Sequence, residues 1–448
     1  MALEKWLIKV KKTIVHSFDS VRASPSTTEK LVINKSKVGV LAFEIAGLMS
    51  KFLHLWQSLS DESICRLRAE AICLEGVRKI ISDDEAFLLS LACAELVENL
   101  KPTAKCISRI SKKCKDSSLR SFESLFDEFA DSGHDPNNWL LSPKEMESMI
   151  KKLDQFVTTT ATLRREMDEL LALENSLKKS LQSNKEYKND ASIQEEKIIL
   201  LKHKILWKRQ EIIYLKDKSL WCRSFDTVTS LLARHVFTIL ARIKLVFGTG
   251  QGFAVSSSAL VYPSKNSNTC SSTSGPLMKN TPNRFDGFLE LNSKILKPHS
   301  STLGAAALSL HYSNLIIVME KMINSPQLVG VDARDDLYSM LSSSIRLALR
   351  ARLKGVGFSA SDPVLAADWR DALQKIVGWL LPLAHNMIKW HNERSFEQQN
   401  LVPKTNVLLF QTLYFANREK TEAAITELLV GLNYIWRFER EMTALLPF

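Results

Sequence analysis

The most acidic short cluster in the sequence is Ser82-Asp83-Asp84-Glu85. Carboxylates beside a hydroxyl are residue types that a metal site or a hydrolytic site would use. The same spacing fits a helix start, because Ser82 accepts from the backbone amide of Glu85 while the Glu85 carboxylate reaches back to the amide of Ser82. Such a capping box explains the cluster without a site, so we predict a structural role.

Two histidines near a glutamate, His385, His391 and Glu393, are the residue types that bind zinc. Ligands on one helical face are expected four residues apart, as in the HExxH motif, whereas these histidines are six apart. We therefore expect a hydrogen-bonded or surface role for them.

Seven cysteines are scattered through the chain without a CxxC pair. Cys65 and Cys73 are eight residues apart, as are Cys106 and Cys114. This is about two helical turns, which places each pair on one face but outside the reach of a shared metal. We expect reduced, mostly buried thiols, with neither a zinc site nor a disulfide framework.

Three alternating glycines, Gly248, Gly250 and Gly252, resemble part of a phosphate-binding loop. Such a loop needs Lys-Ser or Lys-Thr after its last glycine and a strand before it. Phe253-Ala254 follows instead, so we expect no nucleotide site.

Distant residues can converge into a site that no local motif reveals. The candidates are Asp335 and Asp336 together with His311 or His385, and an enzyme would require them to meet in a concave pocket. We regard an enzyme as the least favoured class. The expectation is no catalytic residue, no cofactor, no metal and no small-molecule substrate.

The first 22 residues, MALEKWLIKVKKTIVHSFDSVR, predict an amphipathic basic helix. Lys5, Lys9 and Lys12 lie largely away from its apolar face, and Trp6 is an interfacial residue type, so Lys5, Trp6, Lys9 and Lys12 are candidate contacts to an anionic membrane surface. The alternative is a helix docked on the protein's own core. The apolar face comprises Leu3, Trp6, Leu7, Val10, Ile14 and Phe18.

The formal net charge of +11 favours acidic partners, such as anionic lipid, nucleic acid or acidic protein surfaces. The alternative is a basic surface that is simply solvated. About half of this excess lies in residues 178 to 218, which hold 11 Lys or Arg against 6 Asp or Glu. Basic side chains beside a helical seam are usually its solvated face, so we regard nucleic acid as an unlikely partner.

A long helical hairpin is predicted after Ser142-Pro143-Lys144-Glu145, which combines a capping box with proline at the first helical position. Apolar residues then recur in heptad steps on both sides of a polar break at 183 to 192, which predicts an antiparallel coiled coil. The first seam comprises Leu153, Phe156, Thr160, Leu163, Met167, Leu170, Glu174, Leu177 and Leu181, and the second comprises Ile198, Leu201, Ile205, Lys208, Ile212 and Leu215. A further stripe predicts that the returning helix packs on more than one neighbour: Ile199, Leu206, Ile213 and Leu220.

Two packed helices are predicted in residues 302 to 354. The first ends at Ser325-Pro326, and Asp332 is placed to cap the second, whose last turns are basic. The first helix would share one face among Leu303, Ala307, Leu310, Asn314, Ile317 and Val318.

A third helix should begin at Ser361-Asp362-Pro363, and Pro382 should kink or interrupt it. One or two closing helices are expected between 407 and 445. The buried stripe of the third helix would comprise Leu365, Trp369, Leu373, Ile376, Val377 and Leu380.

Long blocks of the sequence resemble the plant family that includes the PSK simulator growth regulators. Residues 38 to 96 resemble the family's domain of unknown function 3475, and residues 302 to 354, 379 to 400 and 407 to 436 resemble its domain of unknown function 668. The resemblance implies a growth-promoting plant protein linked to hormone or peptide-growth-factor responses. It also implies that the block PLAHNMIKW (382 to 390), which the family shares, forms a wall of a partner groove. Several members begin Met-Gly with a myristoylation pattern, whereas this chain begins Met-Ala.

The sequence therefore predicts an all-α protein made of multi-helical bundles with a long antiparallel coiled-coil hairpin and a flexible linker. We expect a noncatalytic regulator or scaffold that binds protein partners through helical surfaces. The alternative is a basic adaptor for a membrane surface or nucleic acid. The absence of a signal-peptide pattern predicts an intracellular protein, in the nucleus or cytoplasm or peripherally on the plasma membrane. The predicted segments are an amphipathic segment (1 to 30), an N-terminal helical domain (31 to 141), the hairpin (142 to 247), a Ser/Thr/Gly-rich linker (248 to 300) and a C-terminal helical domain (301 to 448).

Overall fold

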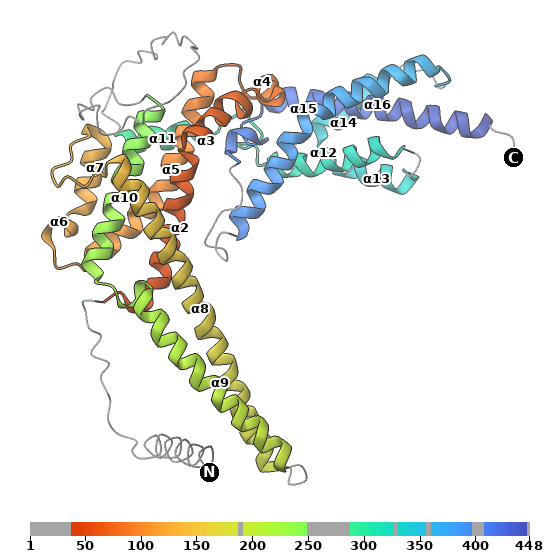
Figure 1. The fold of residues 1–448 in the computed structure, drawn as a ribbon. Helices are drawn as coiled ribbons and strands as arrows, with labels where there is room; N and C mark the ends of the chain where they lie inside the picture. Colours follow the sequence, from red (N-terminus) through yellow and green to blue (C-terminus); the bar gives the residue numbers. More distant parts are fainter. Residues whose placement is uncertain are drawn as a thin grey trace, which may run out of the picture.

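The computed structural model describes residues 37–186, 191–248, 287–326, 329–354, 360–396 and 407–445. Within these ranges the chain is helical, and its β-structure is limited to two isolated bridges, Lys37 with Ser224 and Thr302 with Asn417. The all-α prediction is confirmed. Figure 1 shows one group of helices at each end of the described chain and a long helical pair that projects from the first group.

The first group of helices surrounds a core of aromatic and aliphatic side chains. Phe237 lies near its centre, with ring centroids of Phe129 and Trp139 at 4.6 and 4.9 Å. Residues from the predicted N-terminal domain and from the base of the predicted hairpin contribute to this one core. Its helices are η1 (Gly39–Leu41), α2 (Ala42–Ser58), α5 (Glu85–Ser111), α6 (Ser117–Arg120), α7 (Phe122–Ser132), η3 (Leu220–Cys222), α10 (Phe225–Val246) and α11 (Phe288–Ile295).

The second group forms the C-terminal bundle, whose core includes the fully buried Tyr312 of α12. The Tyr312 hydroxyl donates to a carboxylate oxygen of Glu422 at 2.6 Å, so a buried polar group is satisfied from a neighbouring helix. The helices are α12 (Ser309–Asn324), α13 (Val331–Met340), α14 (Ser343–Leu353), α15 (Pro363–Phe396), η5 (Leu409–Gln411) and α16 (Arg418–Leu445).

A third cluster of buried side chains joins the two groups. It contains Ile72 and Leu88 from the N-terminal part and Phe410 from the C-terminal part. The connecting helices are α3 (Asp61–Arg66), the π-turn η2 (Leu67–Ala71) and α4 (Glu75–Ile80). Helix α4 lies against α15 at Gly76, where an added Cβ would be 2.3 Å from the backbone oxygen of Trp379. The two groups therefore share one hydrophobic junction.

Helices α8 (Pro143–Glu186) and α9 (Ala191–Lys218) pack along each other and project away from the other labelled helices (Figure 1). Ile198, Ile205 and Ile212 of α9 are each 5% exposed, so the predicted second seam is the buried side of this helix. A buried carboxylate, Glu166, pairs with Lys208 across the two helices. The coiled-coil geometry of the pair stays a prediction.

The second apolar stripe of α9 was predicted to pack against a further neighbour, and this prediction is wrong. Leu220 is fully buried, but Ile199, Leu206 and Ile213 are 51, 43 and 62% exposed. Among the described residues, the main neighbours of α9 are α8 along its length and η3 near its end. The apolar pattern predicted a second neighbour that the described residues do not supply.

Several predicted helix starts can be compared with the structure. The capping box at Ser142 is confirmed, because Glu145 N–H donates to Ser142 Oγ at 3.4 Å and Ser142 N–H donates to the Glu145 carboxylate at 2.9 Å. The box at Ser82 is wrong, because Asp84 caps α5 by accepting from Ala86 N–H at 2.9 Å. Three adjacent polar residues competed for the cap position, and the sequence did not show which would take it.

The predicted pair of helices in 302 to 354 is three helices. Residues before Ser309 form turns, Gly330 rather than Asp332 precedes α13, and the chain breaks again before Ser342, which caps α14. The buried face of α12 is also different from the prediction, because Asn314 is exposed whereas Tyr312, Leu315, Ile316 and Met319 are buried. The hydrophobic pattern continues through Ser342, but the hydroxyl of this residue caps a new helix there.

Helix α15 starts at Pro363 as predicted, with Asp362 accepting from Val364 N–H at 2.9 Å. Pro382 does not interrupt it, because the helix runs on to Phe396, and the alternative of a kink stays a prediction. Leu365, predicted to be buried, is 41% exposed. The end of the predicted linker also differs, since residues from 288 to 295 form α11 against α5; residues 249 to 286 lie outside the described ranges.

By length and composition, one helical stretch among the described residues is apolar enough to cross a membrane, Gly39–Ser58. Half of its most apolar window is buried inside the protein, where it forms part of the first core. The thiols are less buried than predicted, because Cys65 and Cys73 are both exposed.

Candidate functional site

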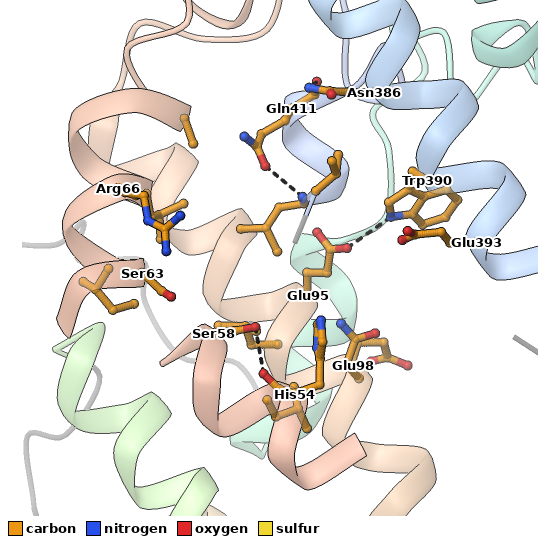
Figure 2. A pocket seen from close by; sticks show the side chains of 18 of the residues that line it. His54, Ser58, Ser63, Arg66, Glu95, Glu98, Asn386, Trp390, Glu393 and Gln411 are labelled. Carbon is orange, nitrogen blue, oxygen red and sulfur yellow. Dashed lines mark hydrogen bonds between the residues drawn. The ribbon is translucent and has the colours of Figure 1, made fainter. Parts of the chain in front are cut away.

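A cavity of about 770 Å³ lies where the N-terminal helices face α15 and η5. Figure 2 shows side chains converging on it from the two groups of helices, including His54 and Glu95 on one side and Asn386 and Trp390 on the other. Its size suits a small molecule or a short stretch of peptide. The cavity is therefore the candidate site of the described chain, and its walls come from both ends of the sequence.

Glu95 lines the cavity and is only 4% exposed. One carboxylate oxygen accepts from the backbone N–H of Leu409 at 2.5 Å. The other accepts from the indole N–H of Trp390 and from the Arg394 guanidinium, both at 3.3 Å. A single carboxylate of α5 thus holds the end of α15 and the start of η5.

Burial raises the pKa of Glu95 above its ordinary value, because charge is costly away from water. The N–H of Leu409, the charge of Arg394 and the N–H of Trp390 act in the opposite direction. Burial is the larger effect, so the net shift is upward. The site therefore contains a carboxyl group that is easier to protonate than a surface glutamate.

The cavity walls carry both signs of charge around an apolar interior. Arg66, Lys51 and Arg394 supply cations, and Glu70 and Glu393 supply carboxylates. Such a lining can orient a ligand that has both charges and an apolar portion, as a peptide segment does. The apolar part of the lining comprises Leu55, Ile64, Leu67, Leu74, Leu96, Pro102, Val407 and Leu408.

The two serines of the cavity are engaged in local structure. Ser58 Oγ donates to the backbone oxygen of His54 at 3.0 Å, and Ser63 Oγ donates to that of Gln57 at 2.9 Å. A serine nucleophile instead donates to a general base. These two hydroxyls are therefore placed as helix-stabilising groups.

The candidate enzyme residues do not meet in this cavity. Asp335 and Asp336 are exposed on α13, and His311 Nε2 is 2.8 Å from the backbone oxygen of Met340. His385 Nε2 lies 3.6 Å from a carboxylate oxygen of Glu320. None of these residues lines the cavity. Across the described ranges, no group of three His, Cys, Asp or Glu residues is arranged to hold a metal ion.

The candidate membrane contacts Lys5, Trp6, Lys9 and Lys12 lie outside the described residues. Sequence reasoning did not single out Glu95, although an acidic residue inside the apolar run LACAELV (91 to 97) was a visible signal of a buried charge. It did single out the block 382 to 390, and the structure places Asn386 and Trp390 of that block in the cavity wall. Arg394, four residues beyond Trp390, was missed.

The fold and cavity define a class: an all-helical protein in which two helical units are packed around a shared junction. A family model described as "Domain of unknown function (DUF3475)" matches residues 40–96. A second model, "Protein of unknown function (DUF668)", matches residues 302–389. The chain therefore carries one of these domains on each side of the junction.

The chain is homologous to PSK simulator proteins of Arabidopsis thaliana, which confirms the resemblance seen in the sequence. It is 27% identical to Protein PSK SIMULATOR 1 over 96% of this chain and 60% of that protein. It is 27% identical to Protein PSK SIMULATOR 3 over 92% of this chain and 58% of that protein. It is 24% identical to Protein PSK SIMULATOR 2 over 98% of this chain and 66% of that protein. The chain thus spans about three fifths of the length of the first two relatives. No solved structure gives a significant match.

Proposed function

We propose that this chain is a noncatalytic helical regulator or scaffold in plant growth responses to a hormone or peptide growth factor. The observation that carries the proposal is the homology to the PSK simulator proteins, which covers 92 to 98% of the chain and includes both domains. A regulator of this kind acts by binding partners inside the cell, in the nucleus or cytoplasm or at the inner face of the plasma membrane.

The cavity between the two domains is the proposed binding site for a protein partner. Its walls combine opposite charges with apolar side chains, which matches a peptide segment better than a bare phosphate or a hydrocarbon chain. Trp390 and Arg394 are residue types that often dominate binding energy at interfaces. Because Glu95 ties both residues to the first domain, occupancy of the cavity would depend on how the two domains are packed.

A second candidate function is reversible contact with an anionic membrane surface. The observation that favours it is the net charge of +11 together with the amphipathic pattern of residues 1 to 22. Lys5, Lys9 and Lys12 would attract acidic headgroups while Trp6 lies at the interface. Deleting residues 1 to 22 should then move the protein from the membrane fraction to the soluble fraction of plant cells, and unchanged fractionation would exclude this function.

Charge reversal in the cavity tests the main proposal. Glu70→Arg combined with Glu393→Lys changes two lining carboxylates, and proximity labelling in plant cells should then lose a subset of the partners found for the wild-type protein. Asp371→Lys together with Glu419→Lys is the matched control, because both carboxylates are exposed and outside the cavity. If the cavity variant labels the same partners as the wild-type protein, a binding role for the cavity is contradicted. Turnover of any substrate by the purified protein would contradict the noncatalytic role.

A further inference from the structure

The outer face of α9 carries an exposed apolar stripe, made of three adjacent pairs at seven-residue intervals. We call it the α9 stripe; it comprises Ile199, Leu200, Leu206, Trp207, Ile213 and Tyr214, which are 51, 57, 43, 75, 62 and 62% exposed. Seven residues are close to two helical turns, so the pairs follow one side of the helix over about 22 Å. Contiguous apolar surface of this kind usually marks an interface.

The α9 stripe points away from α8. At about 100° per residue, its middle lies opposite the side that buries Ile198, Ile205 and Ile212 against α8. Figure 1 shows α8 and α9 projecting away from the other described helices. Within the described ranges no element covers this face, and access to it is open along its length.

We propose that a second copy of this chain covers the α9 stripe, with the two α9 helices antiparallel about a twofold axis between Leu206 and Trp207. The order of the side chains is nearly symmetric about that point. The axis places the pair Ile199 and Leu200 beside residues 213 and 214 of the second copy. His203 lies opposite residue 210, a glutamine, so the polar residues in the middle of the face also meet. A self-complementary patch is what a twofold dimer requires.

The charges on the border of the stripe beside Leu200, Trp207 and Tyr214 support this arrangement, whereas on the other border Lys202 lies beside Arg209 of the second copy. In the antiparallel register, Lys204 lies beside Glu211 of the second copy, and Glu196 lies beside Lys218 of the second copy. The twofold axis repeats each pair, giving four contacts between opposite charges. A parallel pair would instead place each residue beside its own equivalent, so that Lys204 would face Lys204.

The other possible occupants fit these charges less well. Helix α9 contains seven Lys or Arg and four Asp or Glu. The basic segment 1 to 22 of the same chain would meet a basic helix, and an anionic bilayer would meet the carboxylates of Glu196 and Glu211 beside the apolar residues. A second copy also has a basic α9, but its Glu196 and Glu211 can each meet a lysine at the border of the stripe.

The area of the stripe is sufficient for a specific interface. Side chains of this size, exposed by 43 to 75%, present roughly 100–200 Å² each. Six of them approach the ~800 Å² per partner that standard interfaces bury. The dimer is independent of the cavity and of the proposed regulatory function, and either can fail without the other.

Sedimentation equilibrium of the full chain tests the dimer. The wild-type protein should show a monomer–dimer equilibrium, and Leu206→Glu should weaken it at least about tenfold, because residue 206 lies at the centre of the interface. Leu171→Glu is the matched control, since Leu171 is 58% exposed on α8 outside the stripe. Circular dichroism of each variant establishes that the helices remain folded. A wild-type monomer at all concentrations, or a dimer that Leu206→Glu leaves unchanged, would overturn the proposal.

Disulfide trapping tests the register. The reference protein replaces the exposed Cys65 and Cys73, as well as Cys270, by serine. Leu206→Cys should cross-link to itself, because the axis brings residue 206 beside its equivalent. Leu200→Cys and Tyr214→Cys should cross-link when the two proteins are mixed, but neither should do so alone.

Self-cross-linking of Tyr214→Cys to the same extent as Leu206→Cys would exclude the antiparallel register. Deletion of residues 1 to 36 gives a further distinction, because the described chain starts at Lys37, beside Ser224 and close to the end of α9. If the wild-type protein is a monomer and dimerises only after this deletion, the N-terminal segment covers the stripe. That segment would then replace the second copy as the occupant of the stripe.

Discussion

At the scale of single residues, the buried His235 shows how a titratable group can be held neutral in the first core. It is fully buried, its Nδ1 is 2.6 Å from the backbone oxygen of Leu231, and its ring stacks on Phe52 with centroids 6.0 Å apart. Burial lowers the pKa of His235 to about 4. The imidazole therefore stays neutral in the folded chain at pH values where it would be charged in the unfolded chain.

This difference predicts a loss of stability in acid. The folded pKa is below the unfolded value, so the contribution of His235 is complete above about pH 6.5 and is lost as the pH falls toward 4. The free energy of unfolding should fall by about 1.4 kcal/mol per pH unit in that window, or roughly 3 kcal/mol in total. Urea unfolding between pH 7 and pH 4 should show a shallower decline for His235→Leu than for wild type. The exposed His391→Leu should follow the wild-type profile; parallel profiles for all three proteins would contradict the assignment.

A second prediction concerns Glu95, whose carboxylate oxygens accept hydrogen bonds from buried N–H groups. Glu95→Ala would leave the N–H groups of Leu409 and Trp390 without this carboxylate and should cost about 3 kcal/mol of unfolding free energy. Glu95→Gln keeps one oxygen as an acceptor and should cost less. Glu70→Ala, at an exposed cavity residue, should stay within about 0.5 kcal/mol of wild type. Equal stability of Glu95→Ala and Glu70→Ala in urea would show that the carboxylate does not hold the junction.

The same carboxyl gives a pH dependence of opposite sign to that of His235. Its folded pKa is raised, so its contribution is fully present below about pH 4.3, the unfolded value, and is lost as the pH rises through the folded value. The stability difference between wild type and Glu95→Gln should therefore move against wild type as the pH rises from about 4.3. A difference that is constant with pH would mean that burial does not raise the pKa of Glu95.

At the scale of elements, the sequence predicted where apolar stripes lie better than where helices begin. The seam of Ile198, Ile205 and Ile212 followed from periodicity alone and is buried. The helix boundary at Ser342 did not follow from periodicity, because the helical pattern of apolar residues continues on both sides of it. Local capping and tertiary packing decide such boundaries, and a single sequence contains little information about either.

The cavity could not have been assembled from the sequence. Glu95 and Leu409 are 314 positions apart, and no local motif relates two residues at that separation. The block 382 to 390 gave one wall, and it was singled out through the family resemblance rather than through a local pattern. The opposite wall depends on how α5 and the π-turn η2 pack, which is a property of the tertiary fold.

The contact between α4 and α15 depends on the absence of a side chain at Gly76. A Cβ there would lie 2.3 Å from the backbone oxygen of Trp379, so Gly76→Ala should force the helices apart and cost about 2 kcal/mol. At Gly378, next to Trp379 on α15, an added Cβ would meet no neighbouring atom within 4 Å. Gly378→Ala should therefore stabilise the protein by about 0.5–1 kcal/mol through helix propensity. Thermal unfolding of the two variants should shift in opposite directions; a stable Gly76→Ala protein would mean that the helices are not this close.

At the scale of the whole molecule, the two domains are held together by a continuous hydrophobic junction. Ile80 of α4 belongs to the core of the C-terminal bundle, while Leu409, Phe410 and Phe415 pack against the N-terminal helices. Separating the parts would expose these buried side chains to water at a cost of about 1.5–3 kcal/mol each. The junction therefore makes one cooperative unit of two sequence domains that are separated by the long hairpin.

This junction predicts that the chain can be divided and still assemble. A break between residues 260 and 280 lies outside the described ranges and leaves every described helix intact. Coexpressed fragments 1–260 and 280–448 should copurify as a one-to-one complex, and the complex should persist in high salt because apolar contacts rather than exposed ion pairs hold it.

Phe410→Asp places a charge in the junction and should abolish copurification. Exposed Tyr338→Asp, on α13, is the control and should leave the complex intact. Fragments that purify separately while each keeps its helical circular dichroism would show two independent domains, and the cavity between them would then lose its structural basis.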